Sequence, residues 1–211
     1  MSSTETQDTD GATESFVTVT PAGCYYVVES SDPTIARQLL TKILAKPLSP
    51  ALSDFHGLDR ESLVELQKSG FVMFNERSLT LPSGNLMSLL PHVLPALSER
   101  ERVVLTESRQ GLYLDYSGIT REEAEELAVM AANFRKMAEK RSSLLDGKLS
   151  INSRAFGVID PAGNSEIGFW PLHISDNVFT LIILGIPRFN SAQFSTLIWA
   201  LVERYGAQDE E

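Results

Sequence analysis

This sequence is poor in the residues that bind metals or form covalent cross-links. It contains a single cysteine, Cys24, and three scattered histidines, His56, His92 and His173. One thiol cannot close an internal disulfide bond, and no cysteine or histidine cluster has the spacing of a zinc site. We therefore expect no metal and no cofactor. We also expect Cys24 to be buried, as free cysteines commonly are.

Positive charge and long apolar runs are also scarce. Lys and Arg number 18 against 28 Asp and Glu, which gives a net charge of −10 and a pI near 4.8. Such a chain repels nucleic-acid phosphates and anionic membrane surfaces, so neither is a favoured partner. No stretch approaches the roughly 18 apolar residues of a membrane-spanning helix, and residues 1–15 are acidic, unlike a signal peptide. We expect a cytoplasmic protein.

The familiar sequence motifs of catalysis are missing as well. There is no phosphate-binding P-loop, no GxGxxG, no GxSxG and no HExxH. His173 lies between Leu172 and Ile174, where a histidine is more often structural than catalytic. Asp115 and Asp160 have no histidine close in sequence, and we expect them at turns or strand edges. The pattern predicts no catalytic residues and a protein that is not an enzyme.

Residues 16–82 are expected to form a small α+β module. Acidic segments at residues 1–15 and 207–211 are predicted to be tails, because they cannot bury enough apolar surface to fold. Two strands are predicted at the start of the module, Phe16–Val19 and Cys24–Val28. A helix with apolar residues at helical spacing follows them.

The second half of this module resembles part of a winged helix. A helix is predicted over residues 59–68, a glycine fits its C-terminal cap, and residues 71–74 and 79–81 are predicted to pair as a hairpin. A DNA-binding version would need a basic recognition helix, whereas Arg60 and Lys68 are balanced by acids here. A transcription-linked adaptor that uses this module stays an alternative, and a module that contacts protein is favoured.

Residues 83–206 are predicted to form a second unit. It begins with a helix over residues 85–98, which Pro91 and Pro95 should kink or break because each removes a helix hydrogen bond. The strands expected after it are 103–105, 112–114, 156–159, 167–172 and 178–184. The last three form a meander with short turns, which favours antiparallel pairing. A final helix is expected over residues 191–205.

The most regular element is a long amphipathic helix from Thr120 to about Leu145. Thr120 and Glu123 form a capping box, acids fill the first turns and bases fill the later turns, so the charge order complements the helix dipole. One face is rich in alanine, and small residues allow a close approach. We expect this face to lie against a sheet or against a partner helix.

From residue 85 onward the expected order is helix, strand, strand, helix, three strands and helix. The segment Gln110–Leu114, followed by Ser117-Gly118, is similar to an aspartate-glycine turn and strand, with Gln110 where Asp or Asn is usual. Residues 85–206 therefore resemble the roadblock/dynein light-chain family, with residues 122–138 as its central helix. The two prolines in the first helix depart from the family pattern.

The resemblance implies an α+β fold with a five-stranded antiparallel sheet and helices on both faces, here preceded by the small N-terminal module. It also implies a homodimer. In that dimer the central helices, residues 121–141, pack together, and the third strands, about residues 153–159, pair across the two-fold axis. The interface residues it implies are Leu127, Met130, Ala131, Phe134, Ala138, Phe156 and Val158.

Members of this family mostly bind or regulate small Ras-like GTPases, or act as scaffolds in motility and transport complexes. The resemblance therefore implies a dimeric regulatory or scaffold protein whose favoured partner is a small GTPase. A further alternative is a small-ligand sensor, which would need a pocket between the sheet and a helix.

Overall fold

The computed structural model describes residues 14–80, 85–107, 111–151 and 155–206. Its helices are α1 (Pro21–Val28), α2 (Ile35–Leu44), α3 (Gly57–Lys68), α4 (Leu86–Val93), α5 (Arg121–Lys140) and α6 (Ala192–Tyr205). Its strands are β1 (Phe16–Val19), β2 (Val72–Asn75), β3 (Arg102–Glu107), β4 (Leu112–Ser117), β5 (Phe156–Ile159), β6 (Ser165–Ile174) and β7 (Asn177–Leu184). The predictions that fall on the tails, on residues 81–84, on Gln110 and on residues 153–154 lie outside the described residues.

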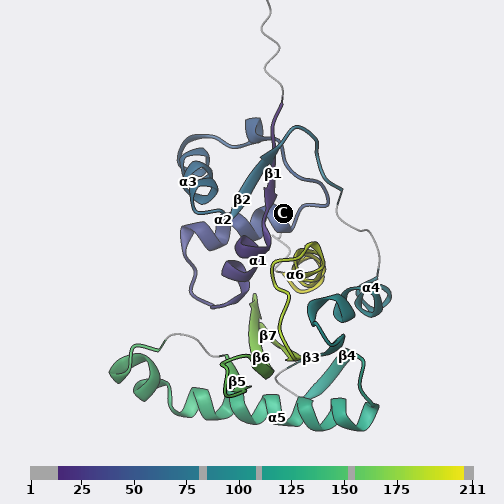
Figure 1. Cartoon of the computed structure of the whole chain (residues 1–211). Coiled ribbons are helices and arrows are strands. Elements are labelled where there is room, and N and C mark those ends of the chain that lie inside the picture. The colour runs from purple at the N-terminus through teal and green to yellow at the C-terminus, as the bar shows by residue number, and fades with distance from the viewer. Residues whose placement is uncertain (1–13, 81–84, 108–110, 152–154, 207–211) are drawn as a thin grey trace, which may run out of the picture.

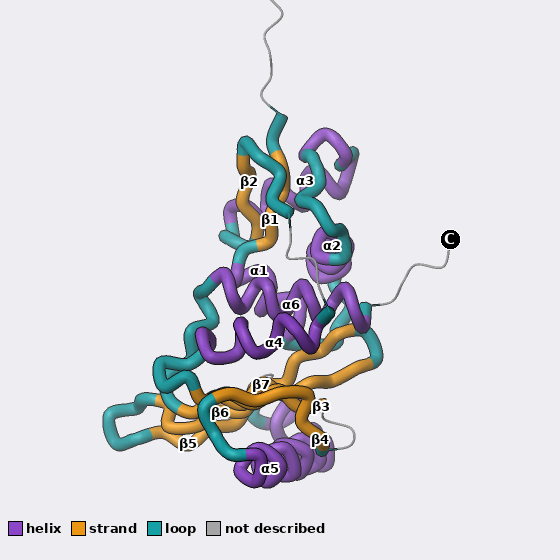
Figure 2. Tube along the Cα trace, turned by 90° about the vertical axis from the view of Figure 1, so that its right-hand side faces the viewer, coloured by secondary structure: helices purple, strands orange, loops and turns teal. Residues whose placement is uncertain are grey.

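The strands form a five-stranded antiparallel sheet in the order β4-β3-β7-β6-β5 and a separate two-stranded sheet of β1 and β2. Helices cover both faces of the large sheet (Figure 1). Helix α5 lies alone across one face, while α1, α4 and α6 form a layer against the other (Figure 2). The rest of the N-terminal module lies beyond that layer, away from α5. The predicted fold class is confirmed.

The predicted strand at Cys24–Val28 is wrong, because this segment belongs to helix α1. Thr20 has extended backbone and its Oγ1 accepts a hydrogen bond from the N–H of Gly23 at 3.1 Å, while Pro21 occupies the first turn. Gly23 lets the helix approach the backbone of Phe71, since an added Cβ would lie 2.1 Å from that carbonyl oxygen. A short apolar run fits a buried helix as well as a strand, so periodicity alone could not decide.

The hairpin predicted over residues 71–81 is also wrong. Strand β2 pairs antiparallel with the distant β1, and Thr80 forms an isolated bridge with Leu48. The choice of a strand partner depends on tertiary packing, which the local pattern cannot show. Among the residues that the structure describes, the winged-helix-like hairpin on which the adaptor alternative depends is therefore not formed.

The second half follows its predictions closely. Helix α4 ends at Val93 and continues as a 3₁₀ helix over Leu94–Leu97, so the prolines break the predicted helix as expected. The capping box of α5 is present, with the N–H of Thr120 donating to Glu123 Oε2 at 2.8 Å. The helix ends at Lys140, earlier than predicted, and a short π-helical segment follows over Ser143–Lys148.

The two faces of the large sheet border different hydrophobic clusters. The larger cluster combines side chains of the N-terminal module with those of α4, α6 and one face of the sheet. The smaller cluster lies under α5 and consists of Val104, Ala124, Ala131, Phe169 and Ile182, with half-buried aromatic residues around them. The division into units near residue 83 stays a prediction, and the two parts share one core.

Candidate functional site

The residues predicted at a dimer interface separate into two groups. Ala131 and Ala138 are buried, at 2% and 3% exposure, so they present no surface to a partner. Ala131 packs against the sheet of its own chain. Contact with a sheet is one of the two arrangements expected for this alanine-rich face, the other being contact with a partner helix. The others remain at least partly exposed to solvent: Leu127, Met130, Phe134, Phe156 and Val158.

These remaining residues, together with Met137, define what we name the α5–β5 surface. The ring of Phe134 on α5 stacks on the ring of Phe156 on β5, with 5.5 Å between centroids and 12° between planes. Val158 lies on the same face of β5 as Phe156, because side chains alternate along a strand. The side chains of Met137 and Val158 are 46% and 59% exposed, so both leave much apolar surface in contact with solvent.

Strand β5 gives this surface a second property. It is an edge strand, and within the described part of the chain its only ladder partner is β6. The backbone N–H and C=O groups on its other side are available to a further strand. An apolar surface beside an open strand edge is suited to pairing with protein.

A second feature is a small pocket under the C-terminal half of α5, of about 110 Å³. Its walls come from α5 and from the strands β5, β6 and β7. The sequence left open whether any pocket lies between the sheet and a helix, and the structure places one there. Its aromatic rings, Phe134 and Phe156, are shared with the α5–β5 surface, and Phe169 completes them.

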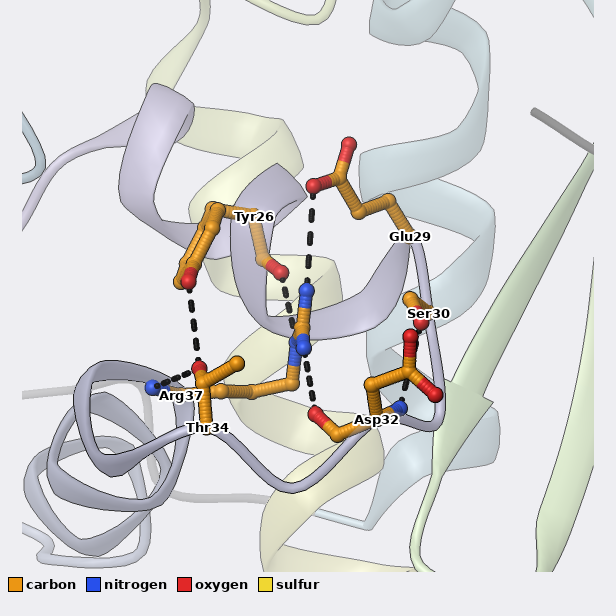
Figure 3. Close-up of polar contacts among 6 residues, drawn as sticks. All are labelled: Tyr26, Glu29, Ser30, Asp32, Thr34 and Arg37. Carbon is orange, nitrogen blue, oxygen red and sulfur yellow. Dashed lines mark hydrogen bonds and ion pairs between the residues drawn. The ribbon is translucent and has the colours of Figure 1, made fainter. Parts of the chain in front are cut away.

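A polar cluster holds the connection between α1 and α2 (Figure 3). The Arg37 side chain, which is nearly buried, donates from Nε to the carbonyl oxygen of Tyr26 at 3.0 Å and from Nη1 to that of Asp32. Its Nη2 lies 3.7 Å from Glu29 Oε1, and its guanidinium lies over the Tyr26 ring at 4.6 Å. Thr34 caps α2 by accepting from the backbone N–H of Arg37 at 3.1 Å. These contacts clamp the connection in place.

The sequence did not single out Arg37. The available signal was an arginine within the apolar stripe of a helix, a position where a charge needs partners. A cleft of about 520 Å³ lies beside the cluster and reaches Pro171 and His173 of β6. Its size is that of small-molecule sites, which span roughly 300–1,000 Å³. The Arg37 guanidinium already bonds to groups of its own chain, so its charge does not indicate which class of ligand would bind in the cleft.

The other residues considered from sequence have structural surroundings. Cys24 is fully buried, and this burial raises the pKa of its thiol to about 12, so the reactive thiolate is suppressed. Asp160 lies in the β5–β6 turn as expected. The Asp160 carboxylate accepts hydrogen bonds from the side-chain and backbone N–H groups of Asn164 and from the backbone N–H of Ala162. These hydrogen bonds lower the pKa of the Asp160 carboxyl group.

Within the ranges that the structure describes, no helix is long and apolar enough to cross a membrane, and no three potential metal ligands lie together. Comparisons with protein-family models, with curated proteins and with solved structures gave no match.

Proposed function

We propose that this protein is a non-enzymatic regulatory or scaffold protein that forms a homodimer through the α5–β5 surface and binds a small Ras-like GTPase. The observation that carries the dimer is the position of exposed apolar side chains beside the open edge of β5. The GTPase rests on the resemblance to the roadblock/dynein light-chain family. That resemblance implies a five-stranded antiparallel sheet with helices on both faces, which is the arrangement of this fold.

The charge order of α5 favours a second copy of the same chain as the partner. Acids lie in its first turns, including Glu122 and Glu126, and bases lie in its last turns, including Lys136 and Lys140. In a dimer whose two-fold axis is perpendicular to both helices, two copies of one helix that pack side by side run antiparallel. Each acidic end then faces the basic end of the other copy, so the charges are complementary. An edge strand also pairs antiparallel with its own copy across such an axis.

Light scattering tests the dimer. The wild-type chain is expected to have twice its monomer mass of 23.3 kDa. Met130→Lys and Val158→Lys place a charge on the α5–β5 surface and should give monomers, because an unpaired charge is costly to bury in an apolar contact. Val129→Lys is the matched control, since Val129 is 55% exposed on the opposite flank of the same helix and should leave the dimer intact. Surface variants that stay dimeric with unchanged thermal unfolding would refute this interface.

Binding to purified Ras-like GTPases, loaded with a non-hydrolysable GTP analogue or with GDP, tests the partner separately. We expect binding that depends on the nucleotide and that weakens in the monomeric variants, because two copies present one continuous surface. Single-turnover GTP hydrolysis measures any regulatory effect. A dimer that neither binds nor alters any of these GTPases would remove the GTPase from the proposal and leave the dimer standing.

A further inference from the structure

An open groove of about 710 Å³ follows one face of helix α3, and we name it the α3 groove. Its residues on that side recur at intervals of three and four, which places them on a single face of the helix. They begin in the first turn of α3 and end just after its last turn, so the groove is about 16 Å long at 1.5 Å per residue. They are Leu58, Glu61, Ser62, Glu65, Leu66 and Ser69.

The opposite wall of the α3 groove is aromatic and held in place. It consists of Tyr26 from α1, Phe71 and the first two residues of α2, Ile35 and Ala36. The rings of Tyr26 and Phe71 stack, with 4.8 Å between centroids and 19° between planes. A hydrogen bond of 3.1 Å joins the hydroxyl groups of Tyr26 and Thr34, next to Ile35 (Figure 3). A wall that is ordered in advance costs a partner less entropy on binding.

The α3 groove also holds the two most exposed large apolar side chains in the ranges that the structure describes. Leu58 is 79% exposed and Ile35 is 72% exposed, whereas Leu66 is buried at 5% and contributes to the base of the groove. A single exposed apolar residue is ordinary on a protein surface. Two of them around one groove, together with an aromatic pair, are typical of a surface that binds protein.

The charges along the α3 groove indicate the chemistry of its partner. Glu61 and Glu65 lie four residues apart on α3 and are the charged residues that line it. No ion pair within the described part of the chain involves Glu61. Glu65 Oε1 lies 2.7 Å from Lys68 Nζ, but both side chains are more than 60% exposed, and such pairs contribute little. A partner with Lys or Arg on one side is therefore complementary to this row of acids.

We propose that the α3 groove binds a short segment of another protein that carries large apolar side chains and a flank of Lys or Arg. The apolar side chains pack against Leu58, Ile35 and the aromatic wall, while the basic flank lies beside Glu61 and Glu65. A helix of about three turns matches the length of the groove.

The terminal segments of this chain do not match this chemistry, because residues 1–13 and 207–211 contain acids and no bases. Helix α3 lies at the far end of the molecule from α5 (Figure 1). The proposed site therefore depends on neither the proposed dimer nor the proposed GTPase.

The probe is a phage-displayed library of random peptides of about 12 residues, enough for three helical turns, selected on the full wild-type chain. We expect enriched peptides to combine large apolar residues with an excess of Lys and Arg over Asp and Glu. The affinity of the most enriched peptide is then measured by fluorescence anisotropy. Leu58→Ser and Ile35→Ser should each weaken it about tenfold, because each removes one apolar side chain from the contact. Val64→Ser is the matched control on the same helix, outside the groove, and should bind as the wild type does.

A charge reversal tests the basic flank of the partner. Glu61→Arg should weaken the enriched peptide at least about fivefold, because like charges then meet. The same variant should bind more tightly than the wild type to a version of the peptide in which Glu replaces each Lys and Arg. Glu76→Arg makes the same change in net charge at an exposed position outside the groove and should have neither effect.

The outcomes separate this site from the others. No enrichment, an enrichment of acidic peptides, or peptides that bind Leu58→Ser and Ile35→Ser as tightly as the wild type would overturn the proposal. A mass in light scattering that falls in Leu58→Ser would assign the groove to a second copy of this chain and would also overturn it. Val158→Lys, which alters the α5–β5 surface, should bind the enriched peptide as the wild type does.

Discussion

The two faces of the large sheet are covered in opposite ways. On one face, α1 and α4 pack beside α6, which brings in large side chains such as Phe194, Leu197 and Trp199, and the core continues into the N-terminal module. On the other face, α5 lies alone, presents alanines to the sheet and leaves a small pocket and an exposed apolar flank. The difference indicates that the first face maintains the fold, while the second face carries the surface that we propose for the dimer.

Truncation of one large side chain on each side of the large sheet should produce the largest difference in the free energy of unfolding. Phe194→Ala, at a fully buried position of α6, should lower the free energy of unfolding by about 3–5 kcal/mol, because it removes apolar contacts and leaves a cavity. Met137→Ala, on the outer flank of α5, should change it by no more than about 0.5 kcal/mol in the monomer. Urea unfolding at low protein concentration measures both, and similar losses would contradict the comparison.

The reactivity of a cysteine thiol distinguishes the two faces of the large sheet, because it depends on solvent access to the thiol and on the thiol pKa. Burial raises the pKa of Cys24 from 9.0 to about 12, which lowers the thiolate fraction about 1,000-fold at pH 8. Iodoacetamide should therefore modify native Cys24 far more slowly than a cysteine placed on α5 by Met137→Cys in a Cys24→Ser background.

The raised pKa of Cys24 also makes the free energy of unfolding depend on pH. This contribution is complete below about pH 9 and is lost as the pH rises toward 12, because only the unfolded thiol ionises in that window.

Rapid modification of Cys24 in the folded wild type, at the rate of the exposed cysteine, would show that the α1 side is not closed.

Ala131→Glu tests whether the alanine stripe belongs to the fold. The new carboxylate would be buried between α5 and the sheet without a partner, so we expect a loss of at least about 2 kcal/mol in the free energy of unfolding. The loss should appear even in dilute monomer, and Val129→Glu on the exposed flank should show little of it. A variant that only changes the oligomeric state would place Ala131 at the interface instead.

Local patterns in the sequence predicted the α5 side better than the module that covers the other face. The capping box of Thr120 and Glu123, the alanine spacing and the apolar runs of the strands are local features, and the elements that they predict form there. Helix α1 was mistaken for a strand, and β2 was paired with the wrong segment. In both cases tertiary packing decides, since a short apolar run is ambiguous and β1 lies far away in sequence.

The pocket could have been suspected from the sequence through one position. Arg135 lies four residues after Ala131 and three before Ala138, so helical spacing already places it on the sheet-facing stripe. From the sequence alone, its charge is accounted for as one of the bases in the later turns of the helix. The aromatic corner beside it was not predictable, because Phe134, Phe156 and Phe169 meet only when α5, β5 and β6 are packed together.

Hydrogen exchange of backbone amides tests the central claim most directly, namely that the open edge of β5 meets a second copy of this chain. Strands β4 and β5 are the two edges of the large sheet, so β4 is the internal control. Peptides that cover β5 should exchange more slowly as protein concentration rises, while peptides that cover β4 should not change. Exchange in β5 that is independent of concentration, across the range in which light scattering detects association, would contradict the account.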